Sequence, residues 1–286
     1  MLVASDAIGK IMALLRLELN MPYPGDPDKE ARVFYTAYYL FSGRDGKNRE
    51  WENTDDSPDE SRTSLIKKTH TLIDLLPKDS RVLDLGAGRQ IFEKEYEDNF
   101  GRPKCKIIAV DIANIPKENL LADAYPHIQA SGRQLPFSND SFDAVVSNMA
   151  FDFMLPEALP ELQRVAKPGA SIFLNLHHPS LLKYDIDHEL AKVKRKMRFE
   201  SKFSKRYEKL KLRKTVLSHH RHLRNNGLLF ETHDQIAKYF TDGGFNIKSI
   251  DIKHDSSNKW WEVDLIKPDS QKVPLAHTGT IFTISR

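Results

Sequence analysis

Short apolar runs alternate with amphipathic stretches between residues 81 and 176, and this alternation predicts a sheet of parallel strands. Runs of this length with β-branched residues are typical of buried strands, while the segments between them have helical spacing. The predicted strands cover residues 81–85, 106–111, 127–130, 142–147 and 171–176. This order predicts an α/β fold with a doubly wound sheet and a ligand crevice at the carboxyl ends of its strands.

The C-terminal part of the chain predicts an antiparallel end to this sheet. Residues 232–242 have a helical pattern that Gly243 and Gly244 close, and residues 245–253 and 278–285 resemble strands. The connection between those two strands is too short for a helical crossover, so we expect an antiparallel return. The whole sheet is therefore predicted as seven-stranded and mostly parallel, with an antiparallel last strand.

The flanking segments predict two helical additions to the sheet. The first twenty residues are amphipathic, and a further helix is expected from Ser57 to Leu76, where Pro77 ends it. We therefore expect a helical cap at residues 1–80, a core at residues 81–286, and a helical lid inserted at residues 178–230.

Composition narrows the class of protein. The chain has 286 residues with 40% apolar side chains, which is enough to bury one large core. Its single cysteine, Cys105, excludes an internal disulfide framework. No apolar run reaches the roughly 18 residues of a membrane span, so we expect a cytoplasmic protein with no membrane partner.

Charge is distributed unevenly along the chain. The segment from Lys183 to Arg224 contains 15 of the 43 Lys and Arg residues but only 5 of the 40 Asp and Glu residues, so the rest of the chain has 28 basic and 35 acidic residues. Such asymmetry is typical of proteins that bind a polyanion. Phe199, Phe203 and Tyr207 recur at a spacing of four within this segment and predict a helical stripe, either for packing or for stacking on bases.

The first predicted strand leads into a turn that suits a nucleotide ligand. Asp84 precedes Gly86 and Gly88, and Asp111 ends the next strand, where it can accept hydrogen bonds from ribose hydroxyls. A dinucleotide site would need a third glycine at position 91, which is Ile91. A carboxylate beside the turn would also repel a pyrophosphate, so these residues favour a cofactor that carries positive charge.

These residues resemble the class I S-adenosylmethionine (SAM) methyltransferases. The D-x-G-x-G turn at residues 84–88, the segment LPFSNDSFDAVVSNMAFDF at 135–153 and the segment ELQRVAKPGASIFL at 161–174 follow that family in order and spacing. The family commonly has a third glycine where Gln90 stands and an aspartate where Ser131 stands. A side chain at position 90 is expected to narrow the cofactor turn.

The resemblance implies SAM as cofactor and transfer of its methyl group to a small-molecule acceptor. An anionic compound is one kind of acceptor that would fit. It places a base or orienting group at Asp152, with His177 and His178 on the same rim as further catalytic candidates, and it requires no metal. The cofactor residues implied are Asp84, Gly86, Ala87, Gly88, Asp111, Ile112, Ser131, Gly132, Arg133, Asn148 and Met149.

Two alternatives remain open at this point. The acceptor can be RNA, with Lys183 to Arg224 tracking its phosphates, or the protein can be a non-catalytic binding protein on the same fold. Trp260 and Trp261 either line the acceptor pocket or are buried between the last strands. His219, His220 and His222 lack accompanying cysteines, so they do not predict a zinc site.

Overall fold

A computed structural model places the two layers of helices around one sheet. It describes residues 60–122, 124–154, 156–182, 186–202, 228–254 and 259–269, together with single residues between 28 and 39 and between 204 and 221. The amphipathic first twenty residues and the histidines at 219, 220 and 222 lie outside the described residues.

The sheet has seven strands, as the sequence predicted, and their order is β3-β2-β1-β4-β5-β7-β6. The strands β1 to β5 pair in parallel, and β7 runs antiparallel to both of its neighbours. The strands are β1 (Arg81–Leu85), β2 (Lys106–Asp111), β3 (His127–Gln129), β4 (Phe142–Asn148), β5 (Ala166–His177), β6 (Asn246–His254) and β7 (Lys259–Ile266).

The antiparallel strand β7 comes earlier in the chain than predicted. Residues 259–266 were assigned to a connection, whereas the predicted strand at 278–285 lies outside the described residues. Because β7 is internal to the sheet, it is buried on both faces, and the acids Glu262 and Asp264 interrupt the apolar run expected of such a strand. Trp260 and Trp261 belong to β7 and are buried there.

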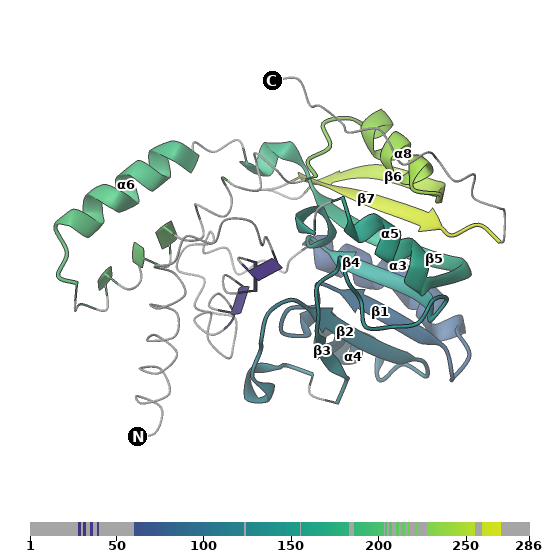
Figure 1. The fold of residues 1–286 in the computed structure, drawn as a ribbon. Helices are drawn as coiled ribbons and strands as arrows, with labels where there is room; N and C mark the ends of the chain where they lie inside the picture. Colours follow the sequence, from purple (N-terminus) through teal and green to yellow (C-terminus); the bar gives the residue numbers. More distant parts are fainter. Residues whose placement is uncertain are drawn as a thin grey trace.

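Helices cover both faces of the sheet (Figure 1). On one face α3 (Glu60–Leu75) and α4 (Ile91–Phe100) contribute Leu65 and Phe92 to a core that includes Val82 of β1. On the other face α5 (Ala158–Val165) and α8 (His233–Asp242) cover a larger core. The helix α8 begins at a capping box formed by Thr232, which matches its predicted start.

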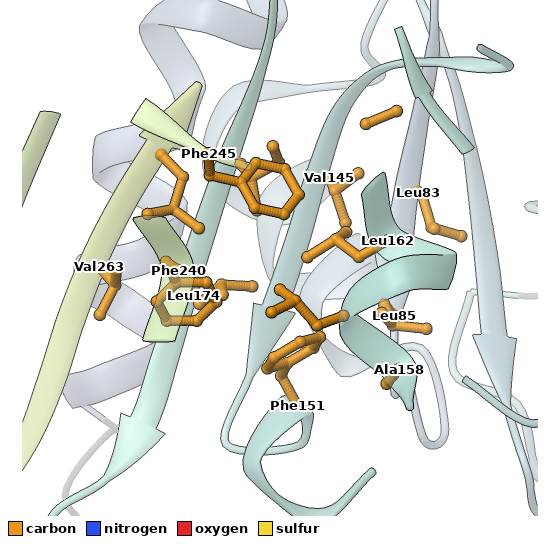
Figure 2. Close-up of a cluster of buried hydrophobic side chains, with 14 of the residues drawn as sticks. Leu83, Leu85, Val145, Phe151, Ala158, Leu162, Leu174, Phe240, Phe245 and Val263 are labelled. Atoms are coloured by element: carbon orange, nitrogen blue, oxygen red, sulfur yellow. The ribbon is translucent and has the colours of Figure 1, made fainter. Parts of the chain in front are cut away.

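The larger core explains how β1 presents its polar residue. Leu83 and Leu85 both point into the core beneath α5 and α8, where Figure 2 shows them near Leu162 and Phe151. Side chains alternate along a strand, so Asp84 points to the opposite face, toward α3 and α4. Asp84 therefore lies beneath the turn that follows β1, on the face of the sheet that α3 and α4 cover.

The predicted lid contains α6 (Ile186–Arg198), which stands apart from the sheet beyond the end at which the parallel strands terminate (Figure 1). Its buried face packs with Leu217 in a small separate core. The helix ends at Arg198 and Phe199 lies in a turn with 87% of its surface exposed. The predicted stripe through Phe199 and Tyr207 is therefore wrong, because these residues do not share one helix; Phe203 lies outside the described residues.

Candidate active site at the carboxyl edge of the sheet

The turn after β1 is closely packed, and two glycines make it possible. Gly86 has a φ of 83°, and a Cβ there would collide with Ala150 in the loop after β4. Gly88 has a φ of 54°, and a Cβ there would lie 2.6 Å from the hydroxyl oxygen of Tyr39. Both positions need the left-handed backbone and the missing side chain of glycine. At both positions a neighbouring residue takes the space that a side chain would need.

Asp111 holds this turn against the end of β2. One of its carboxylate oxygens accepts a hydrogen bond from the Gly88 N–H at 2.8 Å, and the other accepts one from the Ala113 N–H at 2.8 Å. Burial raises the pKa of Asp111, while these backbone donors lower it. Each oxygen retains a lone pair for a further donor such as a ribose hydroxyl.

Gln90 occupies the position of the family's third glycine without filling the turn. It adopts a left-handed conformation with a φ of 63°, and its side chain is fully buried. The amide nitrogen donates to the carbonyl oxygen of Tyr125 at 3.0 Å, which directs the side chain into the protein. Keeping a non-glycine residue in this conformation costs roughly 1–2 kcal/mol.

Asp84 meets a second acid beneath the turn. Glu93 on α4 is fully buried, Asp84 is 3% exposed, and the two carboxyl groups lie within hydrogen-bonding reach of each other. Asp84 Oδ2 and both oxygens of Glu93 lack a donor among the described residues. Burial, followed by the charge of Glu93, raises the pKa of Asp84 well above its ordinary value, and burial raises the pKa of Glu93 to about 7.

A second turn lies after β3, where the resemblance places the adenine. Ser131 pairs with Gln134, and its hydroxyl accepts a hydrogen bond from the Arg133 N–H at 3.1 Å. A Cβ at Gly132 would collide with the sulfur of Met154. This packing brings the turn against the same loop after β4 that touches Gly86.

Three residues of the N-terminal segment reach the same rim. Besides the contact of Tyr39 with Gly88, Thr36 accepts a hydrogen bond from the Asn114 N–H at 2.8 Å. Asp28 forms an ion pair with Arg133 at 2.9 Å. These contacts place described residues of the predicted cap over the turns that follow β1, β2 and β3.

Polar residues that interrupt apolar strands meet at the neighbouring part of the edge. Asn148 Oδ1 accepts from Asn175 Nδ2 at 2.9 Å and from the Ser61 hydroxyl at 3.3 Å. Met149 follows in a left-handed conformation with a φ of 53°, and its N–H donates to the Asn175 carbonyl oxygen. The Asn148 side chain is thus directed toward the start of α3.

Asp152 and His177 form a carboxylate–imidazole pair between the loop after β4 and the end of β5. Asp152 is 1% exposed, and its Oδ2 accepts from the His177 N–H at 2.7 Å and lies 2.8 Å from His177 Nδ1. Because a carboxylate accepts, Nδ1 carries the hydrogen and Nε2 is left as an acceptor. The side chain of His177 is partly exposed, so Nε2 can meet a ligand.

His178 has a different environment from its neighbour. Its Nδ1 accepts from the Ser180 N–H at 3.1 Å, and its ring lies 5.4 Å from that of Trp261. These contacts hold the ring against β7. The sequence singled out both histidines, and the geometry joins only His177 to Asp152.

The remaining cofactor candidates lie on the same edge. Ala87 donates its N–H to the Val110 carbonyl oxygen, and the Ile112 carbonyl oxygen accepts from Gln129. Sequence reasoning missed Glu93 and Asn175, although a polar residue within an otherwise buried apolar face was a signal for both.

Neither a membrane-spanning helix nor a cluster of metal ligands is found among the described residues. None of the described helices is long and apolar enough to cross a bilayer. No group of three or more His, Cys, Asp or Glu side chains in that part of the chain is arranged to hold a metal ion.

Comparison with known proteins gives this site a family context. Residues 83–174 match the model of a methyltransferase domain. A malonyl-[acyl-carrier protein] O-methyltransferase of Erwinia pyrifoliae is 33% identical over 97 residues, which cover 33% of this chain and 36% of that protein. Its counterpart from Halorhodospira halophila is 34% identical over 118 residues, or 38% of this chain and 37% of that protein. The chain thus matches little more than a third of the length of these relatives.

A solved structure extends the likeness to most of the chain. The 1,6-didemethyltoxoflavin-N1-methyltransferase of Burkholderia thailandensis, with its substrate and S-adenosylhomocysteine bound, superposes with a TM-score of 0.53 at 13% identity. The superposition covers 87% of this chain and 94% of that one. At this identity the likeness shows a shared fold.

Proposed function

We propose that this protein, which carries a domain of the class I SAM-dependent methyltransferase type, transfers a methyl group from SAM to a small-molecule acceptor. The observation that carries the proposal is the glycine turn after β1 with Asp111 bonded to it. The lone pairs remaining on Asp111 fit the free ribose hydroxyls of a nucleoside, while Ala150 and Tyr39 pack against the positions where Gly86 and Gly88 lack a Cβ.

When bound, SAM supplies a methyl group on a positively charged sulfur that an acceptor displaces in line. The chain's own contribution is to hold the acceptor, exclude water and remove a proton where the acceptor has one. We assign His177 as the general base, since its Nε2 is an acceptor on the partly exposed side of the ring. Asp152 is a positioning residue that fixes the tautomer of His177.

This assignment favours an acceptor whose reacting oxygen or nitrogen carries a proton. A carboxylate acceptor would need no base, whereas a hydroxyl or amine would gain from one. The two relatives are named malonyl-[acyl-carrier protein] O-methyltransferases, which supports oxygen as the acceptor atom. Because the free acid group of a malonyl unit is a carboxylate, these names do not support the need for a base. The basic residues of α6, beyond the rim, favour an acceptor with an anionic group.

The test begins with cofactor binding. Titration calorimetry with SAM and S-adenosylhomocysteine should give micromolar dissociation constants, and a panel of hydroxyl, amine and carboxylate compounds should then be screened for product with methyl-labelled SAM. Failure of both nucleosides to bind would overturn the proposal. Binding without turnover on every acceptor would favour the non-catalytic alternative.

An RNA acceptor is the second candidate, and the exposed face of α6 supports it. Lys194, Arg195, Lys196 and Arg198 are exposed and make no ion pair among the described residues. Because binding releases counterions from the phosphates, the affinity for RNA should fall steeply between 50 and 200 mM salt. A protein that makes six to ten phosphate contacts loses about 10³- to 10⁵-fold in affinity over this range. An affinity that does not change over this range would end this candidate.

A further inference from the structure

If Asp84 and Glu93 were both ionised, their contact would lack a hydrogen-bond donor. Both groups are at least 97% buried, and carboxylates only accept hydrogen bonds. Three of their four oxygens lack a donor among the described residues. A first proton, shared between the two groups, would provide a donor and remove one of two like charges, and a second proton would leave the pair neutral.

The surroundings of the pair carry charges of both signs. Arg62 on α3 is a cation that lowers the pKa of Asp84, and its Nε also donates to Glu95 at 2.8 Å. From β2, Asp111 adds a negative charge, and from the loop before β3 the phenol of Tyr125 interacts more strongly with Glu97 than with Glu93. His127 lies beside Asp111, and burial lowers its pKa.

The position of the pair connects it to the cofactor. Asp84 lies two residues before Gly86, and Glu93 is in the first turn of α4, the helix that the glycine turn begins. A change in the charge of the pair therefore acts directly beneath the turn. SAM carries a positive charge on sulfur that S-adenosylhomocysteine lacks, so such a change affects the two nucleosides unequally.

We infer that Glu93 is a positioning residue of the cofactor site, which holds a proton against Asp84 and releases it to solvent when the cationic cofactor binds above them. The inference rests on the proposed function. In the proton-rich form the pair is neutral, and in the form with one proton it carries one negative charge that attracts SAM. Loss of the charge on sulfur during transfer removes part of this attraction, which favours exchange of product for substrate.

The pair should make SAM affinity depend on pH. Burial raises the pKa of Glu93 to about 7, so the charged form becomes dominant as pH rises from 6 to 8. We expect the dissociation constant of SAM to fall about tenfold over this interval, the order of magnitude for one buried unit charge near another. S-adenosylhomocysteine should show a smaller change.

The experiment compares titration calorimetry of the full chain and of Glu93→Gln at pH 6, 7 and 8, in two buffers with different ionisation enthalpies. Wild type should release a proton on binding SAM near pH 6.5. Glu93→Gln keeps the size of the side chain and offers an N–H donor to Asp84, so its affinity should not vary with pH. Asp98→Asn, on the exposed side of the same helix, is the matched control and should behave as wild type.

The outcomes separate this inference from the proposed function. If SAM binds and the variant keeps the pH dependence of wild type, or if wild type releases no proton, Glu93 does not have this role. If neither nucleoside binds at any pH, the proposed function itself fails. Should Glu93→Gln not fold, proton release by the wild-type protein in the two buffers decides the question.

Discussion

Two buried aspartates lie at the carboxyl edge of the sheet, and their partners give them opposite chemistry. Asp84 at the end of β1 and Asp152 after β4 are both almost fully buried, and each leaves one oxygen without a donor among the described residues. Asp84 faces another acid, Glu93, whereas Asp152 faces the imidazole of His177. Burial is thus common to the two acids, and the group beside each one differs: a second acid lies beside Asp84 and a donor beside Asp152.

The largest expected effect comes from breaking the Asp152–His177 pair. His177→Ala removes the proposed base, so kcat should fall about 10²- to 10⁴-fold, the usual contribution of general base catalysis. SAM affinity should change less than about threefold, because the Asp84 half of the edge is untouched. Steady-state kinetics and calorimetry measure the two effects separately.

His178→Ala is the control for that variant, since its ring packs against Trp261 and should matter little for kcat. Asp152→Asn should also lower kcat, because it weakens the contact that orients His177. Equal losses in the two histidine variants would contradict the distinction between them.

The fold was predictable where local patterns determine it. Strands β1, β2, β3 and β4 and the helix α8 lie within a few residues of their predicted positions, because apolar runs and capping residues define them. The strand β7 was misplaced because Glu262 interrupts it. Glu262 is satisfied by Ser64 and Lys68 from α3, about 200 residues earlier, and no local pattern reveals such a partner.

The substitution Glu93→Gln, at the acid that faces Asp84, should have the next largest effect. The pKa of Glu93 rises from 4.5 in its ordinary range to about 7 in the folded protein. The stability that it contributes is therefore present below about pH 4.5 and is lost as pH rises through about 7.

The variant should consequently be more stable than wild type at pH 8, by about 1–3 kcal/mol, and similar to wild type at pH 5. Urea unfolding at the two pH values gives the difference, with Asp98→Asn as the exposed control. A stability difference that is the same at both pH values would show that Glu93 is not held as a protonated acid.

Asp111→Ala tests an acid that, unlike Asp84 and Asp152, has a donor for each of its two oxygens. Its two oxygens accept from the N–H groups of Gly88 and Ala113. Removal leaves these donors and the ribose hydroxyls unpaired, so SAM binding should weaken by about 1–3 kcal/mol, or roughly 5- to 150-fold. Calorimetry showing unchanged affinity would remove Asp111 from the ribose site.

The site was predictable in its parts but not in its pairings. The order of strands brings Asp84, Asp111 and the loop after β4 to one edge, which the sequence supported. The turn of Gln90 away from the glycines depends on the carbonyl oxygen of Tyr125, and the partner of Asp84 depends on the facing side of α4. Three-dimensional packing, and not the local sequence, sets the direction of these side chains.

The smallest expected effect concerns the N-terminal segment, whose described residues contact the turns after β1, β2 and β3. Asp28→Asn weakens the ion pair with Arg133, whose side chains are 28% and 22% exposed, so we expect a cost of only about 0.2–1 kcal/mol. Stopped-flow measurement should therefore show release of S-adenosylhomocysteine up to about fivefold faster. The increase should shrink at high salt, because screening already weakens the pair.

Glu200→Gln removes the ion pair with Arg206 from the predicted lid, where Glu200 is 23% and Arg206 72% exposed, and should leave the release rate unchanged. Neither substitution should alter the pH dependence that Glu93 imposes, since both lie outside the buried pair. A release rate that is faster in the lid variant and unchanged in Asp28→Asn would mean that the lid closes the cofactor turn and the N-terminal segment does not.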